Sequence, residues 1–291
     1  GGEHRAPRIR RKMDAKTHDR YLATSKQRRV PGTAMAEYRV TALNAGEFEI
    51  PGPELFWMGA WGEWYRLNLI VLLVQGDGVT ALVNTGPPDD IGPLNDLFVQ
   101  AVGERGRLNV GPEHSVVAQL TRLGVSPEAV THLLVTPFQA YASGGIGRFP
   151  GAQVCLSKRG WLSYHTTHTH PHDGRDLMFT KSIVTALVTD RWDQVRLLED
   201  EDEILPGLRT WFAGTHHRAS VAVEIDTRLG TVVASDAFFH YANIEQNRLL
   251  GINESMYEGL STYERARRSA DIIVPLYEPR VFERHPGGEL A

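Results

Sequence analysis

The sequence predicts an α/β protein in which two β-sheets are packed between layers of helices. Three observations lead to this fold class. Short apolar runs typical of strands recur in both halves of the chain, helical patterns separate them, and a glycine-bearing turn joins two of the runs as an antiparallel hairpin. With 291 residues, 42% of them hydrophobic, the chain is long enough to bury a substantial core.

The first half of the chain contains the predicted hairpin. Residues 66–75 are rich in Leu, Ile and Val, and Gly76-Asp77-Gly78 supplies the turn into residues 80–84. Further strands are expected at residues 38–43, 48–50, 132–136 and 153–156. A helix is expected to open at Pro112 and to end at Gly124, because the apolar residues between them share one face. These apolar residues are Val116, Val117, Leu120 and Leu123.

The second half repeats the alternation of strands and helices. Strands are expected at residues 194–198, 208–213, 220–225, 231–235 and 272–276, and helices at 257–269 and 279–284. The acidic run at residues 199–203 has five consecutive carboxylates, which on an extended chain cannot all converge on one cation. We therefore expect a solvated turn there, and not a cation site.

Composition divides the chain at about residue 35. Residues 1–34 carry ten Lys and Arg against three Asp and Glu and almost no large apolar side chain, which predicts a basic, disordered extension. Such a segment is either an upstream leader before a start at Met35 or a tail that binds nucleic acid or an anionic surface. Residues 35–291 are expected to form one domain.

Charge, cysteine content and hydropathy limit the classes of function. A net charge of -4 argues against a nucleic-acid binder. The single cysteine, Cys155, excludes an intrachain disulfide and fits a reducing compartment. No run approaches the roughly 20 apolar residues that cross a bilayer. We therefore predict a cytoplasmic protein without nucleic-acid or membrane partners.

The most informative segment runs from Thr136 to Gly145 and reads Thr-Pro-Phe-Gln-Ala-Tyr-Ala-Ser-Gly-Gly. It resembles the metal loop Thr-His-x-His-x-Asp-His-x-Gly-Gly of the metallo-β-lactamase superfamily, with the ligands replaced. Pro137 and Gln139 stand at the first two His positions, Tyr141 at the Asp and Ala142 at the third His. Catalytic zinc normally needs three protein ligands and an open position for water, and this loop offers no adequate donor.

Other segments resemble the same superfamily in the same order, particularly its branch of N-acyl homoserine lactonases. They are residues 81–87 (Ala-Leu-Val-Asn-Thr-Gly-Pro), residues 204–208 with 214–220, residues 234–237 (Ala-Ser-Asp-Ala) and residues 273–279 (Ile-Val-Pro-Leu-Tyr-Glu-Pro). The resemblance extends from about Tyr38 to the end of the chain. It implies a metallo-β-lactamase-like αββα four-layer sandwich, with two mixed β-sheets flanked by helices.

Carried over residue by residue, the resemblance leaves only His216 and Asp236 as competent metal ligands. Tyr277 replaces the last histidine, Phe239 a tyrosine three residues after the bridging aspartate, and Asn84 an aspartate that supports the site. We therefore expect no cofactor, and zinc only if other residues complete the site. The histidine-dense segment from His165 to His172 is either such a metal site or a solvated loop.

Catalysis without a metal would need an internal base and donors to a developing oxyanion. His216 oriented by Asp236 is the candidate base, and Tyr141 and Tyr277 are the candidate donors, with Glu278 nearby. The predicted pocket residues are Gln139, His217, Phe239, Trp57 and Trp61. The two tryptophans belong to an aromatic group with Phe56, Trp64 and Tyr65, which is a wall over the pocket, a subunit interface or plain core packing.

Two classes of function remain. In the first, the chain is an auxiliary or non-catalytic subunit, a pseudoenzyme of a homo- or hetero-oligomer that acts with an intact paralogue on a small hydrophobic ester, lactone or ether. In the second, it is a metal-independent or atypical-metal hydrolase that uses His216 and Asp236. A small-molecule binding protein is a third option.

Overall fold

A computed structural model describes residues 37–166 and 175–291. The expectations for residues 1–34, for a start at Met35 and for most of the segment from His165 to His172 fall outside these residues. Within the described residues, no helix is long and apolar enough to cross a membrane.

The first sheet has six strands in the order β1-β2-β3-β4-β5-β6. The strands β1, β2 and β3 pair antiparallel, and β3 to β6 pair parallel, so the sheet is mixed. Its strands are β1 (Arg39–Pro51), β2 (Trp64–Gly76), β3 (Val79–Val83), β4 (His132–Val135), β5 (Gln153–Ser157) and β6 (Val195–Leu198).

The second sheet has five strands in the order β11-β10-β9-β8-β7. It is mixed as well, because β10 and β11 pair parallel while the other neighbours pair antiparallel. Its strands are β7 (Glu201–Leu205), β8 (Leu208–Phe212), β9 (Val221–Thr227), β10 (Gly230–Ser235) and β11 (Ile272–Pro275).

The alternation of side chains along β2 shows how the two sheets are layered. Leu69, Val71 and Leu73 face a core shared with the helices that cover the first sheet. Ile70, Leu72 and Val74 face the opposite way, into a core shared with strands of the second sheet. Since successive residues of a strand point to opposite faces, β2 is buried on both sides and lies in the middle of the sandwich.

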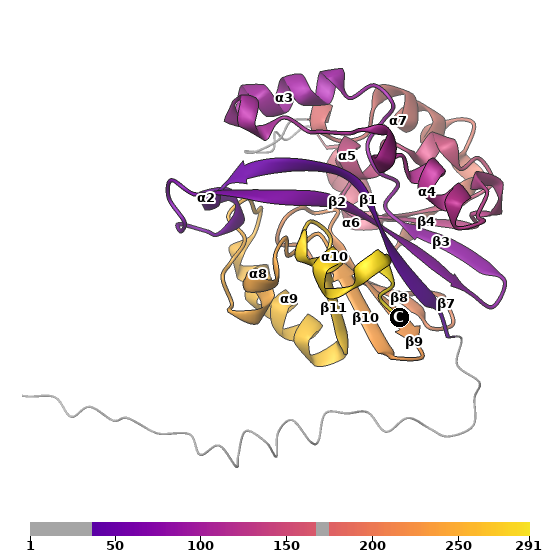
Figure 1. Cartoon of the computed structure of the whole chain (residues 1–291). Coiled ribbons are helices and arrows are strands. Elements are labelled where there is room, and N and C mark those ends of the chain that lie inside the picture. The colour runs from indigo at the N-terminus through magenta and orange to yellow at the C-terminus, as the bar shows by residue number, and fades with distance from the viewer. Residues whose placement is uncertain (1–36, 167–174) are drawn as a thin grey trace, which may run out of the picture. The chain divides into compact units, whose positions relative to one another are not determined.

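Helices cover both outer faces (Figure 1). The first sheet is covered by α3 (Gly92–Val102), α4 (Val116–Arg122), α6 (Lys158–Tyr164) and α7 (Lys181–Val188). The second is covered by α8 (Tyr241–Glu245) and α9 (Met256–Ser269), whose Ile244 and Tyr263 pack on Trp211 and Val233. Three short helices follow strand ends: α2 (Gly52–Leu55), α5 (Ala140–Ser143) and α10 (Arg280–Arg284). The predicted αββα sandwich is confirmed.

The predicted hairpin is also confirmed. Gly76 pairs with Val79, which leaves Asp77 and Gly78 as a two-residue loop with φ of 49° and 74°. Positive φ at both loop residues is what such a tight hairpin requires, and an Asp-Gly pair tolerates it.

Three predicted boundaries were wrong. Residues 38–43 and 48–50 join into the single strand β1, which bulges between Asn44 and Glu47. The helix at Pro112 is a 3-10 turn, and α4 begins after Ser115, whose hydroxyl accepts a hydrogen bond from the Ala118 amide. Only the start of the acidic run is a turn, because Glu201 already belongs to β7.

Candidate active site

Four loops bring the predicted site residues together. They follow β4, β8, β10 and β11, so two sheets contribute to one place. Seven side chains there are between 0% and 7% exposed, and we call them the buried cluster. The members are Gln139, Tyr141, His216, His217, Asp236, Phe239 and Tyr277. The structure shows that these side chains are buried together. That they form a functional site stays a prediction.

Asp236 is held by hydroxyl groups. The Thr136 hydroxyl donates to one carboxylate oxygen and the Ser220 hydroxyl donates to the other, at 2.5 Å. The Thr136 and Ser220 hydroxyls accept from the amides of Val221, at 2.9 Å, and His217, at 3.0 Å. Burial raises the pKa of Asp236 to about 6, against the opposing effects of Ser220, Thr136 and His217.

These bonds join the two sheets. Thr136 follows β4 of the first sheet, whereas Val221 begins β9 and Asp236 follows β10 of the second. A buried carboxylate with both oxygens hydrogen-bonded satisfies its own polarity and that of its donors. In this position Asp236 therefore acts as a structural link.

His216 is oriented by a backbone carbonyl. Its Nδ1 lies 2.9 Å from the Ile252 oxygen, and because a carbonyl only accepts, the proton is on Nδ1 and the lone pair is on Nε2. Its ring meets Phe239 edge-on, with 4.9 Å between ring centroids. The acceptor at Nδ1 is thus Ile252, and not Asp236 as the sequence-based His-Asp pair required.

His217 and Gln139 form a second buried contact. The Gln139 side-chain amide touches Nε2 of His217, and Nδ1 of His217 lies 3.6 Å from a Glu254 carboxylate oxygen. Electrostatically, His217 also opposes the rise that burial causes in the pKa of Asp236.

Aromatic rings fill the middle of the cluster. The Tyr277 ring lies 4.3 Å from Phe239 and 6.0 Å from Tyr141, measured between centroids. Tyr141 also packs on Phe48 and Phe98. Burial raises the pKa of Tyr277 well above its usual value, as do the nearby Tyr141 and Asp236. The two phenols that were predicted to serve an oxyanion thus belong to this aromatic packing.

Little space remains at this place. Tyr141 and Tyr277 line a cavity of about 10 Å³, together with Asn84, Gly86 and neighbouring residues of β2. A cavity of this size accommodates about one water molecule. An ester or lactone does not fit it.

The buried cluster does not fit zinc. At the ligand positions carried over from the motifs, the donors are Nε2 of His216 and Asp236, and both oxygens of Asp236 already bind hydroxyls. The remaining imidazole, His217, contacts Gln139 with Nε2 and lies near Glu254 with Nδ1. The positions that would complete a site carry Pro137, Ala142 and Tyr277. In residues 37–166 and 175–291, no three His, Cys, Asp or Glu side chains are grouped so as to hold an ion.

Three predicted contributors lie elsewhere. Trp57 and Trp61 are 50% and 68% exposed and line neither this cavity nor the larger pocket. Of the three alternatives for their aromatic group, these two side chains form neither a wall over this cavity nor core packing, and a subunit interface stays a prediction. Glu278 is buried, but the Tyr241 amide, Arg280 and His240 occupy its carboxylate. Although burial favours the neutral acid, these partners, Arg280 first, hold the pKa of Glu278 below its usual range.

Sequence reasoning missed the hydroxyl groups that hold Asp236. Thr136 is the first residue of the altered metal loop and Ser220 is the last residue of the altered His loop. Both residues are unchanged from the Thr and Ser of the family motifs, so the motifs could have pointed to them. The sequence could not reveal the contact of His216 with Ile252, because Ile252 accepts through its backbone carbonyl.

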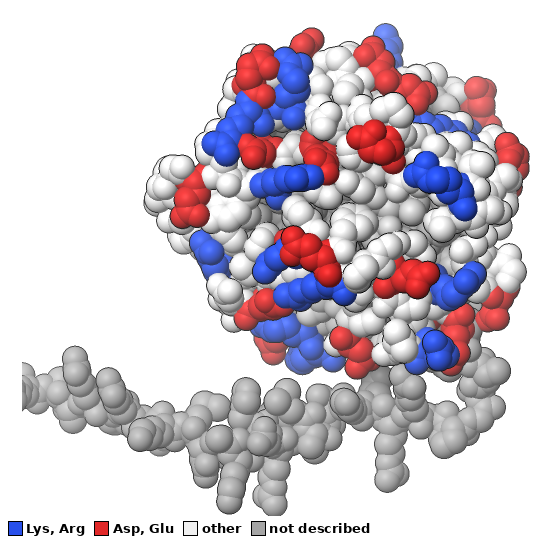
Figure 2. Space-filling model, in the orientation of Figure 1, with Lys and Arg blue, Asp and Glu red and all other residues white. Residues whose placement is uncertain are grey.

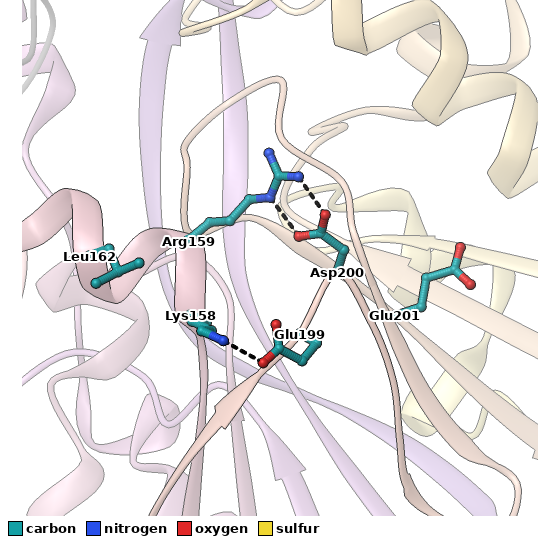
Figure 3. Close-up of a pocket in the computed structure, with 6 residues that line it drawn as sticks. All are labelled: Lys158, Arg159, Leu162, Glu199, Asp200 and Glu201. Carbon is teal, nitrogen blue, oxygen red and sulfur yellow. Dashed lines mark hydrogen bonds and ion pairs between the residues drawn. The ribbon is translucent and has the colours of Figure 1, made fainter.

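A larger pocket of about 490 Å³ lies on the surface (Figure 3). Its charged side chains pair with each other: Lys158 with Glu199, and Arg159 with Asp200. On the face drawn in Figure 2, positive and negative side chains are likewise intermixed. The pocket contains none of the predicted site residues.

This arrangement of sheets, helices and loops is the metallo-β-lactamase fold. Solved structures similar to the chain include an N-acyl homoserine lactone hydrolase with N-hexanoyl-L-homoserine at its catalytic metal centre, at a TM-score of 0.71 and 17% identity over 86% of this chain and 96% of that one. A probable metal-dependent hydrolase from Staphylococcus aureus matches with a TM-score of 0.65 and 14% identity, over 84% and 91%. The dizinc quorum-quenching lactonase AidC matches with 0.61 and 12%, over 88% and 90%.

The resemblance inferred from the motifs is thus confirmed for the fold. At sequence identities of 12–17%, these structures establish the shared fold and not a shared activity. No family model and no curated protein matches the chain.

Proposed function

We propose that the chain is a non-catalytic, auxiliary subunit that associates with a chain of the same fold whose metal ligands are intact. The pair would hydrolyse a small ester, lactone or ether. One observation carries this proposal: the residues at the family's metal-ligand positions lie in a buried cluster, beside a cavity of about 10 Å³ lined by Tyr141 and Tyr277. No group in it is more than 7% exposed, so a substrate has no access to His216 or Asp236.

The substrate class rests on the structural neighbours. Two of them are described as an N-acyl homoserine lactone hydrolase and a quorum-quenching lactonase, each with an N-acyl homoserine product bound. A subunit with this fold, whose buried cluster is filled by side chains, would stabilise the intact paralogue or form one wall of its substrate pocket. The paralogue would then act on substrates like those of the structural neighbours. This supports a small, partly apolar acyl compound as substrate of the complex.

One observation favours a second function, metal-independent hydrolysis by the chain itself. The lone pair of His216 is on Nε2, within the cluster, and a neutral imidazole is a competent general base. For this function the aromatic side chains of Phe239 and Tyr277 would have to move aside.

The decisive experiment is an assay of short-chain lactones and aryl esters with untagged protein. The isolated chain is expected to show no hydrolysis, with or without chelator. Co-expressed with a paralogue that keeps the His-x-His-x-Asp-His loop, it is expected to copurify and to raise the paralogue's kcat/KM or half-life.

Hydrolysis by the isolated chain that persists in chelator and disappears in His216→Ala would overturn the proposal in favour of the second function. His132→Ala, a partly buried histidine on β4, is the matched control. It is expected to leave any such activity unchanged.

A further inference from the structure

The loop between α2 and β2 presents large apolar side chains to solvent. Trp57, Met58 and Trp61 are 50%, 65% and 68% exposed. We call residues 56–63 the finger, because Figure 1 shows α2 and the ends of β1 and β2 projecting beyond the helical layers. Exposed aromatic groups of this kind on a soluble fold mark contact sites more often than isolated apolar residues do.

The finger has a defined structure. The Gly52 amide donates to the Glu63 carbonyl and the Trp57 amide to the Leu249 carbonyl, both at 2.8 Å. Phe56 at its base is 2% exposed, and the Arg248 guanidinium lies 3.4 Å from the centre of its ring. The exposed indoles are therefore carried by a backbone that the core holds in place.

Backbone strain supports the same conclusion. Met58 and Ala60 have φ of 53° and 55°, in the left-handed region that costs free energy for residues with a Cβ. Such conformations persist only where the surrounding structure imposes them. The fold thus maintains an unfavourable backbone at the point where it turns apolar side chains outward.

The apolar tip of the finger, residues 57–62, carries no charge, and the one charged residue of the finger is Glu63 at its end. A second copy of the same chain would present the same surface, and like charges facing each other would repel. An uncharged surface avoids this repulsion at a two-fold axis, where each residue meets residues of the same patch.

A second exposed apolar group adjoins the finger through Leu249. This residue binds the Trp57 amide with its carbonyl, while its side chain lies against Gly259 of α9, where an added Cβ would be 2.8 Å from its Cδ2. In the same first turns of α9, Tyr257 is 89% and Leu260 is 49% exposed.

The area of both groups matches a small stable interface. With about 150–250 Å² per aromatic side chain, the five exposed residues offer about 600 Å² per copy, or about 1,200 Å² between two copies. This is the lower end for specific complexes, whereas the finger alone would reach only the size of a packing contact. We propose that the finger, Tyr257 and Leu260 together form a two-fold interface between copies of this chain.

The inference does not depend on the proposed function. The test is sedimentation of the full chain from about 1 to about 100 μM, where interfaces of this size dissociate. The wild type is expected to form a dimer, and the double variant W57A/W61A to raise the dissociation constant at least about 100-fold, because buried tryptophans dominate such contacts. Trp192→Ala, at a 59% exposed tryptophan on another surface, is the matched control and is expected to dimerise like the wild type.

A cysteine variant tests the geometry independently of affinity. The chain has one cysteine, Cys155, and it is fully buried, so Met58→Cys supplies a single accessible thiol. Under a mild oxidant such as oxidised glutathione it is expected to give a disulfide-linked dimer much faster than Leu229→Cys, at a comparably exposed residue in the β9–β10 turn.

Three results would overturn the inference. They are a wild type that stays monomeric at the highest concentration, a dimer that survives in W57A/W61A, and equal crosslinking of the two cysteine variants. Binding of the monomeric wild type to phosphatidylcholine vesicles, lost in W57A/W61A, would instead assign the finger to a lipid surface.

Discussion

The molecule has two groups of aromatic side chains with opposite environments. Tyr141, Phe239 and Tyr277 are at most 7% exposed, whereas Trp57 and Trp61 are at least 50% exposed. The first group fills the buried cluster, and the second projects from a loop in which Met58 and Ala60 have positive φ. The comparison shows that aromatic side chains pack a buried centre in one region of the molecule and form an exposed apolar surface in the other.

The polar residues around the buried cluster sharpen this contrast. Thr136, Ser220 and Asp236 form a closed set of hydrogen bonds between the two sheets. A buried network of this kind is stabilising only when every member has a partner. The buried cluster is therefore part of the core, and the Asp236 carboxylate stabilises the packing of the two sheets.

Truncation of one ring from each group should show the largest difference. Tyr277→Ala removes a 2% exposed ring and is expected to lower the free energy of unfolding by about 3–5 kcal/mol, the usual cost of a large cavity. Trp61→Ala should change it by no more than about 0.5 kcal/mol for the monomer. Urea unfolding at low protein concentration measures both. Equal losses would mean that the finger is part of the core.

Removal of the central carboxylate should cost somewhat less. Asp236→Ala leaves the hydroxyls of Thr136 and Ser220 without their acceptor and is expected to destabilise the fold by about 2–4 kcal/mol. Asp236→Asn keeps one acceptor oxygen and should lose roughly half as much. Chemical denaturation of both variants tests this order, and a neutral effect of Asp236→Ala would contradict the role of Asp236 as a link between the sheets.

Much of the fold was predictable because its signals are local. The Gly76-Asp77-Gly78 turn, the apolar run of β2 and the ordered motifs required only neighbouring residues. β1 was harder, since its bulge between Asn44 and Glu47 interrupts the alternation by which a continuous strand is recognised. The acidic start of β7 was missed because its carboxylates obscure a strand that pairs through its backbone.

The burial of the candidate site residues in one place was predictable from the motifs, whereas their contacts were less so, and their function stays a prediction. The motifs identified His216, Asp236, Tyr141 and Tyr277, which the fold buries together. They did not show that the Ile252 carbonyl orients His216, because a backbone acceptor leaves no trace in residue identity. The exposure of Trp57 and Trp61 depends on φ angles at Met58 and Ala60 that neither residue type favours.

A pH experiment examines the base of the finger. Burial raises the pKa of Glu54 in α2 from 4.5 to about 6, so the folded state binds this proton more tightly than the unfolded state does. Stability from this group is complete below about pH 4.5 and is lost as pH rises to about 6. Glu54→Gln has no such loss. The difference in the free energy of unfolding between this variant and the wild type should therefore increase by about 1–2 kcal/mol, in favour of the variant, from about pH 4.5 to about pH 6. Exposed Glu128→Gln is the control, and a pH-independent advantage of Glu54→Gln would contradict the burial.

The smallest expected effect is the response of the wild type to metal. A ligand that binds only the folded state raises its stability, by about 2.7 kcal/mol at a concentration of about 100 times the dissociation constant. His216 and Asp236, the donors at the carried-over ligand positions, fall short of the three ligands that zinc needs, and His217 already contacts Gln139 and lies near Glu254. Neither zinc nor a chelator should therefore move the Tm of the untagged wild type by more than about 1 °C.

The triple variant Tyr141→Asp, Ala142→His and Tyr277→His provides the matched comparison. It returns donors to three positions that the fold gathers around Asp236, and it removes the Tyr141 ring and exchanges the Tyr277 phenol for a smaller imidazole. Without metal it should unfold more easily than the wild type, because buried aromatic volume is lost and polar groups take its place. With zinc it should recover several degrees in Tm. If the wild type gains as much from zinc as this variant, the donors at these three positions are irrelevant, and the aromatic side chains do not keep metal out of the cluster.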